Sequence, residues 1–376
     1  MKIAQICPFF LPNSGGVEEY VHLLSRYLTK KGIEVDVLTT DILRGSKKKL
    51  RKFEKIDGIR VFRFSPLFSF GNFGYFWPSF ITILMREKYD LVHTHVYRHP
   101  HTFIAVSICK LMGIPCIITT HSPFHPSKNL IRKIFTSFFD IFLKWYLTLF
   151  NKIIVINDNE MKKFGKFVKN KASIIPIGLP TYFFSTKKEK KKKSKRKVIL
   201  YVGRVHESKD LDFLLKSIVT TNRNVELLLA GPIESRNYYL KLKNFIEKYE
   251  IKARFLGKMR RYKLVEVYDN SDIVFIPSPY EAFGIVILEA FARGKPVVAV
   301  DSDGPRYLIK NGENGFLVRY EDVESAAKYI QLLLKDKRLY KKISINNIRK
   351  ARQFRWNKIA KKIIKVYEEA IKKYDH

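Results

Sequence analysis

The stretch Ser271–Val300, which reads SDIVFIPSPYEAFGIVILEAFARGKPVVAV, decides the fold of this chain. Its apolar residues predict a strand at Ile273–Ile276, then a helix over residues 284–293, and a second strand after Gly294. Apolar strands separated by a helix are typical of a parallel sheet that helices cover on both faces. The stretch therefore predicts the α/β class.

Groups that suit an anionic ligand with hydroxyl groups lie inside this stretch. Glu281 stands in the loop after the first strand, and Glu289 stands in the helix. The first backbone amides of a helix lack partners within it and form an anion site. Here they belong to Phe283, Gly284, Ile285 and Val286. Because open α/β sheets bind ligands at the carboxyl ends of their strands, we expect these groups to line one crevice.

The composition is strongly basic. The chain has 71 Lys and Arg against 35 Asp and Glu, a formal net charge of +36. Such a surface attracts nucleotide phosphates, anionic lipid headgroups and nucleic acid, although lysine-rich chains also arise without a specific ligand. No recognised nucleic-acid motif is present, so we do not expect nucleic acid as a partner.

The N-terminal half opens with a βαβ pattern. The strand KIAQIC leads through a loop with Gly15 and Gly16 to a helix over residues 17–31 and the strand EVDVLTT. Paired glycines at a helix N-terminus let the backbone approach a phosphate. They fit a tight turn equally well, and the dinucleotide pattern G-x-G-x-x-G is absent. The basic residues 44–55 predict an exposed loop.

Histidines gather at the ends of two predicted strands. One group consists of His93, His95, His99 and His101. It suggests a metal site, but no acidic ligand lies near, so polar residues at the strand end of a crevice fit better. His121 follows the strand IPCIITT, at the edge where such sheets carry their active sites. For this residue a structural and a functional role are equally plausible.

Two apolar segments raise the question of a membrane. Residues 64–85 carry no charge, but glycines and prolines interrupt them, so we predict no spanning helix. Residues 130–150 predict an aromatic helix with basic residues near its ends, either a core helix or a helix at a lipid surface.

No signal peptide is visible, and three scattered cysteines in apolar runs predict buried free thiols of a reducing compartment.

The C-terminal half begins after a lysine-rich run at residues 187–197, which predicts a solvated linker. The strand VILYVG then leads to a turn that Arg204 and Lys209 flank, with Asp210 as the predicted N-cap. Two cations at the mouth of a parallel strand suit a diphosphate, because arginine offers a fork of donors and lysine a point charge.

These residues resemble the retaining, nucleotide-sugar-dependent glycosyltransferases of the group-1 (RfaB-like) family, which have the GT-B fold. The resemblance covers nearly the whole chain. It rests on the Gly15-Gly16 loop, TTH at residues 119–121, IIPIG at 174–178, YVGRVHESKD, LAGP at 229–232, FLG at 255–257 and the pair Glu281 and Glu289 in EAFGIVILE. Departures are Ser302-Asp303-Gly304-Pro305 in place of Gly-Gly, Tyr307 in place of Glu, and Asn157 in place of Ser.

The resemblance implies two Rossmann-like domains that face each other across a cleft, with the last helix crossing back to the first domain. We expect an N-terminal acceptor-side domain (residues 1–184 with 356–376), a linker (185–197) and a C-terminal nucleotide-sugar domain (198–355). The last helix should bury Ile359, Ile363, Val366 and Ala370.

The resemblance also implies roles for single residues. Arg204 and Lys209 would hold the donor diphosphate, together with the Gly15-Gly16 loop and the amides of residues 283–286. Glu281 would bind sugar hydroxyls, Glu289 the ribose hydroxyls, and His121 the sugar. Neither a metal nor a cofactor is implied beyond the nucleotide-diphosphate sugar.

The expected function is transfer of a hexose-type sugar from a UDP- or GDP-sugar to a lipid-linked or membrane-glycan acceptor. We expect a cytoplasmic protein that associates peripherally with the anionic cytoplasmic face of the membrane. A glycoside hydrolase also needs two carboxylates but has no use for two phosphate sites. The alternatives are another enzyme of the same fold, an epimerase or phosphorylase, and a nucleic-acid-binding protein, to which the +36 charge points.

Overall fold

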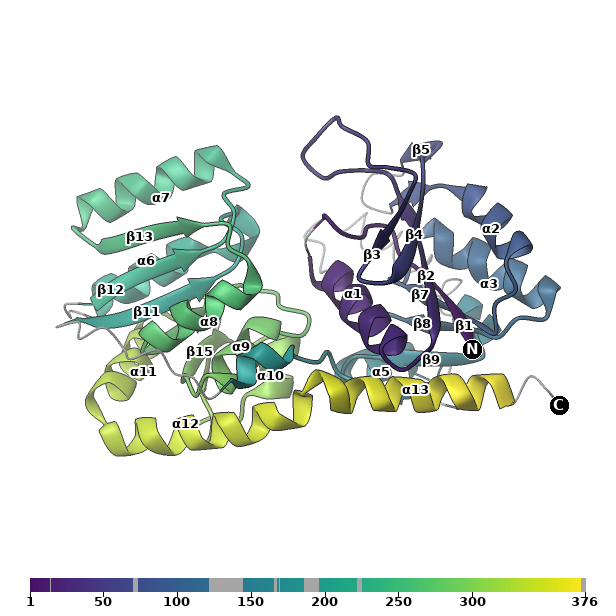
Figure 1. The fold of residues 1–376 in the computed structure, drawn as a ribbon. Helices are drawn as coiled ribbons and strands as arrows, with labels where there is room; N and C mark the ends of the chain where they lie inside the picture. The colour runs from purple at the N-terminus through teal and green to yellow at the C-terminus, as the bar shows by residue number, and fades with distance from the viewer. Residues whose placement is uncertain are drawn as a thin grey trace. The chain divides into compact units, whose positions relative to one another are not determined.

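The computed structural model describes residues 1–13, 15–69, 74–121, 145–165, 168, 170–185, 196–221 and 225–372. The chain forms two compact units (Figure 1). The N-terminal domain comprises Met1–Gly178 together with Trp356–His376, and the C-terminal domain comprises Leu179–Arg355.

The N-terminal domain is built on a largely parallel sheet. Its strand order is β10-β9-β8-β7-β1-β2-β4-β3, and β3 alone pairs antiparallel among the strands described in this sheet. The strands are β1 (Lys2–Ile6), β2 (Glu34–Thr40), β3 (Phe53–Ile56), β4 (Ile59–Phe64), β7 (Leu91–His95), β8 (Cys116–Thr119), β9 (Lys152–Val155) and β10 (Ala172–Ile174). A short hairpin, β5 (Phe68–Ser69) with β6 (Tyr75–Phe76), stands apart from it.

Apolar clusters cover both faces of this sheet. The helical segments are α1 (Gly16–Thr29), η2 (Pro78–Phe80), α2 (Ile81–Arg86), α3 (Pro100–Met112), η3 (Leu147–Leu149), α5 (Asp158–Phe164) and α13 (Trp356–Lys372). One buried cluster joins the sheet to α2, α3 and η3, and another joins it to α1 and α13. This double cover explains why β1, β7, β8 and β9 are buried almost throughout.

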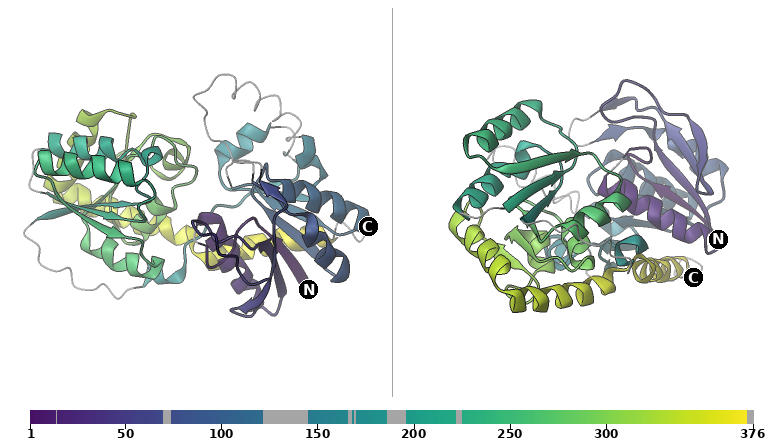
Figure 2. Two further views of the ribbon diagram at one scale, coloured as in Figure 1. Left: turned by 90° about the horizontal axis from the view of Figure 1, so that it is seen from above. Right: turned by 60° about the vertical axis from the view of Figure 1, so that its left-hand side comes forward.

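The C-terminal helix α13 is part of the N-terminal domain, where it lies beside α1 (Figure 2). The predicted apolar face is confirmed, because Ile359, Ile363, Val366 and Ala370 are all buried. At its start, Trp356 is buried and donates from Nε1 to the carbonyl of Leu23 on α1 at 3.0 Å. The helix thus closes one face of the sheet.

The C-terminal domain has a fully parallel sheet with the order β13-β12-β11-β14-β15-β16. The strands are β11 (Lys197–Val202), β12 (Val225–Ala230), β13 (Lys252–Gly257), β14 (Ile273–Ile276), β15 (Val297–Val300) and β16 (Phe316–Val318). The helical segments are η5 (Thr181–Phe184), η6 (Glu207–Lys209), α6 (Leu211–Thr220), α7 (Arg236–Lys248), α8 (Arg261–Asn270), α9 (Ile285–Ala292), α10 (Asp303–Leu308), α11 (Val323–Lys335), α12 (Lys337–Ala351) and η7 (Arg352–Phe354). The predicted strand–helix–strand at residues 271–300 is confirmed as β14, α9 and β15.

One predicted boundary is wrong. Residues 53–55, predicted as the end of an exposed loop, belong to β3, because they pair with β4. Residues 179–184 make their contacts with the C-terminal unit. There the buried Arg293 donates to the carbonyls of Phe183 (3.1 Å) and Ser185 (2.7 Å) and pairs with Asp269, which anchors the segment to α8 and α9.

Several predicted segments fall partly outside the described residues. Most of the lysine-rich linker (186–195) does so, as does most of the aromatic helix predicted at residues 130–150 (to residue 144). Among the residues that were placed, no helix has the length and apolar character needed to cross a membrane. The cysteines Cys7, Cys109 and Cys116 are buried and free, as predicted.

Candidate functional site

In the C-terminal domain, the predicted donor-binding residues flank the point where the strand order reverses. From β11 the chain adds β12 and β13 on one side, and it then adds β14 to β16 on the other. Arg204 and Lys209 follow β11, and Glu281 follows β14. The structure brings two of these groups together, since Lys209 Nζ lies 3.1 Å from Glu281 Oε2. Because ligands bind at such switch points in open α/β sheets, we take this pair as the candidate site of this domain.

Arg204 is directed elsewhere in this structure. Its guanidinium lies 2.6 Å from Glu234 Oε2, and about half of the side chain is exposed. An exposed ion pair of this kind contributes little stability. A diphosphate would therefore compete effectively with Glu234 for Arg204. The predicted cap is confirmed, since Asp210 accepts from the amide of Phe213 at the start of α6.

Two glycines shape the loop that carries Glu281. Gly284 caps α9 with φ of 82°, a left-handed conformation that favours glycine. Gly304 donates to the carbonyl of Glu281 at 2.8 Å. A Cβ on Gly304 would lie 2.7 Å from that carbonyl oxygen and 2.6 Å from the carbonyl carbon of Phe283. The sequence Ser-Asp-Gly-Pro thus keeps glycine where α10 meets the Glu281 loop.

Glu289 lies in a different environment from Glu281. Its side chain is buried. Both carboxylate oxygens are engaged by α8, since Arg261 Nε donates to Oε1 at 2.9 Å and Tyr268 OH donates to Oε2 at 2.7 Å. The role predicted for Glu289, binding the ribose hydroxyls, would require a rearrangement of these partners. Neither Arg261 nor Tyr268 was singled out from the sequence, because nothing in the local pattern marks them.

In the N-terminal domain, the Gly15-Gly16 loop lies at the start of α1, as predicted. The carboxylate of Glu18 lies beside this loop, since a Cβ placed on Gly15 would be 2.2 Å from Glu18 Oε2. Glu18 is buried and pairs with Arg44 at 2.7 Å. Burial raises the pKa of Glu18, and Arg44 opposes this. An anionic ligand at this helix N-terminus would therefore meet Glu18 and its cation Arg44 together.

His121 follows β8 and has a left-handed backbone with φ of 55°, which is strained for a residue other than glycine. Its ring packs edge-on against Tyr20 of α1, with ring centroids 4.8 Å apart. His121 Nε2 lies 3.1 Å from His95 Nδ1. Burial lowers the pKa of His121 to about 3, so the ring is neutral near pH 7. Strain held by the surrounding packing is common at functional sites.

Three histidines of the 93–101 group, which the sequence predicted as polar residues at the strand end of a crevice, are buried in this structure. His93, His95 and His101 are fully buried, and each bonds to protein atoms. In the described part of the chain, no group of three or more His, Cys, Asp or Glu side chains is arranged to hold a metal ion. His93 and His95 are buried because β7 is an inner strand of the sheet, and His101 is buried in the first turn of α3.

A capping motif holds the residue that precedes His121. The Asn157 side chain accepts from the amide of Glu160 at 2.9 Å at the start of α5. Glu160 in turn accepts from the amide of Ile156 and from the hydroxyl of Thr120. Asparagine therefore serves as an N-cap as serine does, and its departure from the family pattern leaves the local structure intact.

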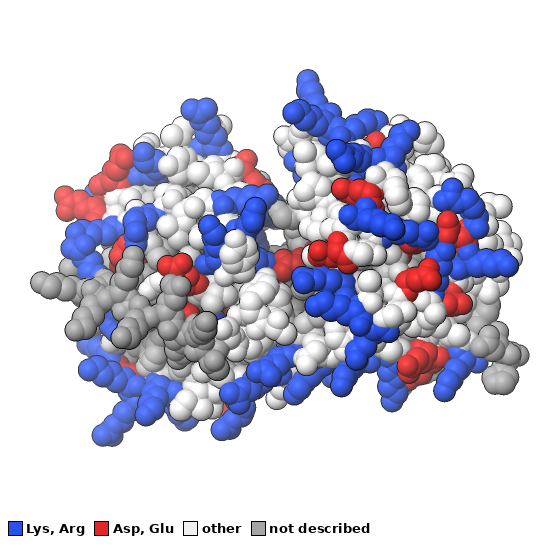
Figure 3. All heavy atoms as spheres, viewed as in Figure 1, with Lys and Arg blue, Asp and Glu red and all other residues white. Residues whose placement is uncertain are grey.

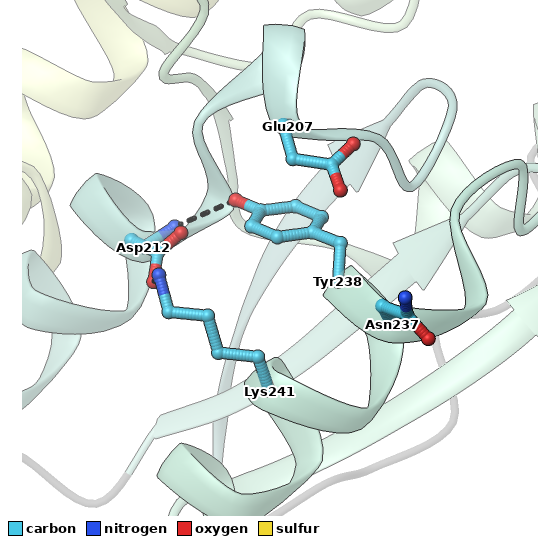
Figure 4. Close-up of a pocket in the computed structure, with 5 residues that line it drawn as sticks. All are labelled: Glu207, Asp212, Asn237, Tyr238 and Lys241. Carbon is cyan, nitrogen blue, oxygen red and sulfur yellow. Dashed lines mark hydrogen bonds and ion pairs between the residues drawn. The ribbon is translucent and has the colours of Figure 1, made fainter.

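A hollow of about 330 Å³ lies beside the predicted diphosphate loop. Figure 4 shows the side chains around it, Glu207, Asp212, Asn237, Tyr238 and Lys241. None of the predicted site residues lines it. Asp212 pairs with Lys241, and Glu207 accepts from Ser235, so these groups satisfy one another on the surface.

Basic side chains spread over both domains on the face shown in Figure 3. They outnumber the acidic ones there and form no single stripe. On this face the positive charge therefore favours anions in general.

Two family models match the chain in succession. "Glycosyltransferase Family 4" matches residues 14–182, and "Glycosyl transferases group 1" matches residues 183–350. Among curated proteins, an uncharacterized glycosyltransferase of Methanocaldococcus jannaschii is 27% identical over 99% of both chains. A phosphatidyl-myo-inositol mannosyltransferase of Mycobacterium leprae is 24% identical and covers 98% of this chain and 96% of its own.

Solved structures share the fold. The sucrose-phosphate synthase of Thermosynechococcus elongatus has a TM-score of 0.79 at 20% identity, over 98% of both chains. The Anabaena protein HepE, in complex with UDP and glucose, has a TM-score of 0.77 at 18% identity, over 98% of this chain and 100% of its own.

Proposed function

Because the chain belongs to the group-1 glycosyltransferases of the GT-B fold, we propose that it moves a hexose-type sugar from a UDP- or GDP-sugar to a lipid-linked or membrane-glycan acceptor. The transfer retains the configuration at the sugar carbon and uses no metal. The observation that carries this proposal is the pair Lys209 and Glu281 at the switch point, with Nζ and Oε2 3.1 Å apart. It sets a cation for phosphate beside a carboxylate for hydroxyls, next to the α9 N-terminus.

The reaction needs stabilisation of two opposite charges. The bond between the sugar carbon and the diphosphate oxygen breaks, which leaves an oxocarbenium-like sugar and an anionic diphosphate. Lys209, Arg204 and the α9 amides stabilise the diphosphate, while Glu281 holds sugar hydroxyls. The acceptor hydroxyl attacks on the face that the diphosphate leaves, and its proton passes to the departing phosphate oxygen. No protein base is needed for that step.

His121 contributes a neutral imidazole in this proposal. Its pKa of about 3 keeps it uncharged near pH 7, so it contacts a sugar hydroxyl rather than transferring a proton. The amides of the Gly15-Gly16 loop offer further donors for the donor phosphates, beside the paired Glu18 and Arg44.

For the acceptor, support comes from relatives and from the surface. One relative is named a phosphatidyl-myo-inositol mannosyltransferase and others a phosphatidylinositol N-acetylglucosaminyltransferase subunit. Large apolar side chains of the N-terminal domain are exposed, among them Leu67 (70%), Met85 (68%) and Trp145 (53%). Exposed apolar groups on a basic protein suit an anionic lipid surface. We therefore infer peripheral association with the cytoplasmic face of the membrane.

The transferase proposal is tested by incubating the purified full chain with a panel of UDP- and GDP-sugars and a membrane lipid extract. Mass spectrometry should detect a lipid that gains one hexose, and NMR should show that the new linkage keeps the anomeric configuration of the donor. Activity should persist with EDTA. If no donor is consumed, or if the chain instead binds RNA in a salt-dependent manner, the proposal is wrong.

Membrane association is tested by flotation with phosphatidylglycerol vesicles at low and high salt. Binding should be strong at low salt and should weaken when Leu67 and Met85 are both replaced by serine. Tyr262→Ser is the matched control, because Tyr262 is 51% exposed on the C-terminal domain. An absence of flotation at low salt would contradict the inference.

A further inference from the structure

A continuous set of buried hydrogen bonds leads from the C-terminal helix to His121. We call this set the histidine chain. It runs through Tyr367, Gln5, His95 and His121, with a branch from Tyr367 to His93 and Thr119. The inner members are fully buried, and His121, at the outer end, is partly exposed.

The order of donors along the chain follows from Gln5. With its amide nitrogen facing Tyr367, Gln5 Nε2 donates to the tyrosine hydroxyl at 3.0 Å. Its carbonyl oxygen Oε1 lies 2.7 Å from His95 Nε2, and a carbonyl only accepts, so His95 carries its proton on Nε2. In a neutral imidazole the other nitrogen is then an acceptor. His95 Nδ1 must therefore accept from His121 Nε2, which lies 3.1 Å away.

The branch agrees with this order. The hydroxyl of Tyr367 accepts from Gln5, so its single proton is free to go to His93 Nδ1 at 2.8 Å. His93 then carries its own proton on Nε2 and donates it to the hydroxyl of Thr119 at 2.8 Å. Every link thus has one donor and one acceptor.

We propose that Gln5 and Tyr367 are positioning residues that fix His121 as the tautomer protonated on Nε2, leaving Nδ1 as an acceptor for a hydroxyl group of the donor sugar. This inference rests on the proposed transferase function. It assigns a role to the C-terminal helix, because Tyr367 lies on α13 while Gln5 lies on β1.

The tautomer decides which ligand group His121 recognises. A bare Nδ1 accepts a proton from a hydroxyl and disfavours an anionic phosphate oxygen, which has no proton to donate. The reversed order would place a proton on Nδ1 and suit phosphate instead. The histidine chain therefore directs His121 to the sugar rather than to the diphosphate. Burial lowers the pKa of His93, His95 and His121, which keeps the neutral tautomers in place.

The first test reads the tautomer directly in the ligand-free full chain. Long-range proton–nitrogen correlation NMR on nitrogen-15-histidine protein should show His121 and His95 protonated on Nε2 with Nδ1 bare. Tyr367→Phe removes the acceptor of the Gln5 amide, and Gln5→Met removes the link to His95. Both variants should convert His121 to a mixture of tautomers. Tyr89→Phe is the matched control, because Tyr89 is a buried tyrosine of the same domain that bonds to Asp36.

The second test separates positioning from stability. With the donor that the wild-type chain uses, Tyr367→Phe and Gln5→Met should lower kcat/KM by about 5- to 10-fold, the effect of one neutral hydrogen bond. The Kd for the free nucleoside diphosphate should stay within about twofold, because His121 contacts the sugar only. Tyr89→Phe should leave both values unchanged even if it lowers Tm.

The outcomes separate this inference from the proposed function. A reversed tautomer in the wild-type chain, or an unchanged tautomer in both Tyr367→Phe and Gln5→Met, would overturn the inference even in an active transferase. The predicted tautomers in a chain that consumes no nucleotide sugar would leave the hydrogen-bond order established and refute the transferase role.

Discussion

At the scale of single residues, Glu281 and Glu289 differ because of what surrounds them. Glu281 is about a quarter exposed and contacts one cation, Lys209. Glu289 is 1% exposed and is held by Arg261 and Tyr268. Glu281 is therefore available to a ligand as it stands, whereas Glu289 is tied to α8. The same residue type, eight positions apart, thus lies in two different environments.

A first prediction concerns these carboxylates. Glu281→Gln should lower kcat about 100-fold or more, because it removes the charge that we propose faces the sugar, and leave nucleotide affinity within about threefold. Glu289→Ala should weaken nucleotide binding about tenfold and also lower Tm, since it leaves Arg261 without its buried partner. Steady-state kinetics, calorimetric titration with UDP and GDP, and thermal denaturation measure these effects.

The control for both variants is Glu226→Gln. Glu226 pairs with the exposed Arg254 on the outer strands β12 and β13, away from the predicted site. Its kinetics should match those of the wild type. Wild-type turnover in Glu281→Gln, together with wild-type nucleotide affinity in Glu289→Ala, would refute the assignment.

A second prediction tests the glycine loop. A Cβ on Gly16 would meet nothing within 4 Å, whereas one on Gly15 would meet Glu18. Gly16→Ala should therefore fold as well as the wild type and gain up to about 1 kcal/mol in stability, because alanine favours the helix. If the α1 N-terminus approaches the donor phosphates, KM for the donor should still rise about tenfold. An unchanged KM would show that the two glycines form only a turn.

The candidate site residues could be predicted from the sequence because each of them follows a predicted strand. Lys209 and Glu281 follow different strands, and they meet because parallel strands present their carboxyl ends at one edge. Gly304, Gln5 and Tyr367 could not be found in this way. Gly304 matters through a backbone contact with a distant loop, and Gln5 and Tyr367 act through partners far along the chain.

At the scale of elements, helix α13 closes the N-terminal domain. The spacing of its apolar residues predicted its buried face correctly, because the amphipathic pattern of a helix depends only on residues close in the sequence. Strand β3 was missed because it is only four residues long, follows a run of basic residues and pairs with β4 at the edge of the sheet. The contacts of residues 179–184 could not be predicted from the sequence for a similar reason. They depend on Arg293, more than a hundred residues away.

A third prediction concerns α13. Trp356 is 5% exposed, contacts the Tyr20 ring and donates to the carbonyl of Leu23. Trp356→Ala should destabilise the N-terminal domain by about 3–5 kcal/mol, the range for removal of a large buried side chain. Trp145→Ala is the matched control, because Trp145 is 53% exposed, and it should change stability by less than about 0.5 kcal/mol.

Urea unfolding followed by tryptophan fluorescence measures this difference. All three tryptophans, Trp77, Trp145 and Trp356, belong to the N-terminal domain, so the signal reports on that domain alone. Equal unfolding midpoints for the two variants would contradict the view that α13 is part of the domain's core.

At the scale of the whole molecule, the excess of lysine and arginine lies on the surface, whereas the histidines that the N-terminal domain buries are uncharged. Burial lowers the pKa of His99 to about 4 and of His101 and His121 to about 3, and it lowers the pKa of His93 and His95 well below the usual value of 6.5. Unfolding would return all of them to that usual value.

Acid should therefore destabilise the N-terminal domain in a window set by these histidines. Below pH 6.5 the unfolded chain binds protons that the folded chain rejects, so each buried histidine lowers the free energy of unfolding by about 1.4 kcal/mol per pH unit. This loss continues down to about pH 4, where His99 also becomes protonated in the folded state. Ion-paired carboxylates destabilise the fold only at lower pH. Lys2 and Arg60 lower the pKa of Glu87 to about 2, so the stability that Glu87 contributes is lost only below pH 4.5. The urea midpoint from tryptophan fluorescence should thus be flat from pH 8 to pH 7 and fall steeply between pH 6.5 and 5. A midpoint that stays constant to pH 5 would mean that the histidines take up protons in the folded domain, and the neutral histidine chain would then be wrong as well.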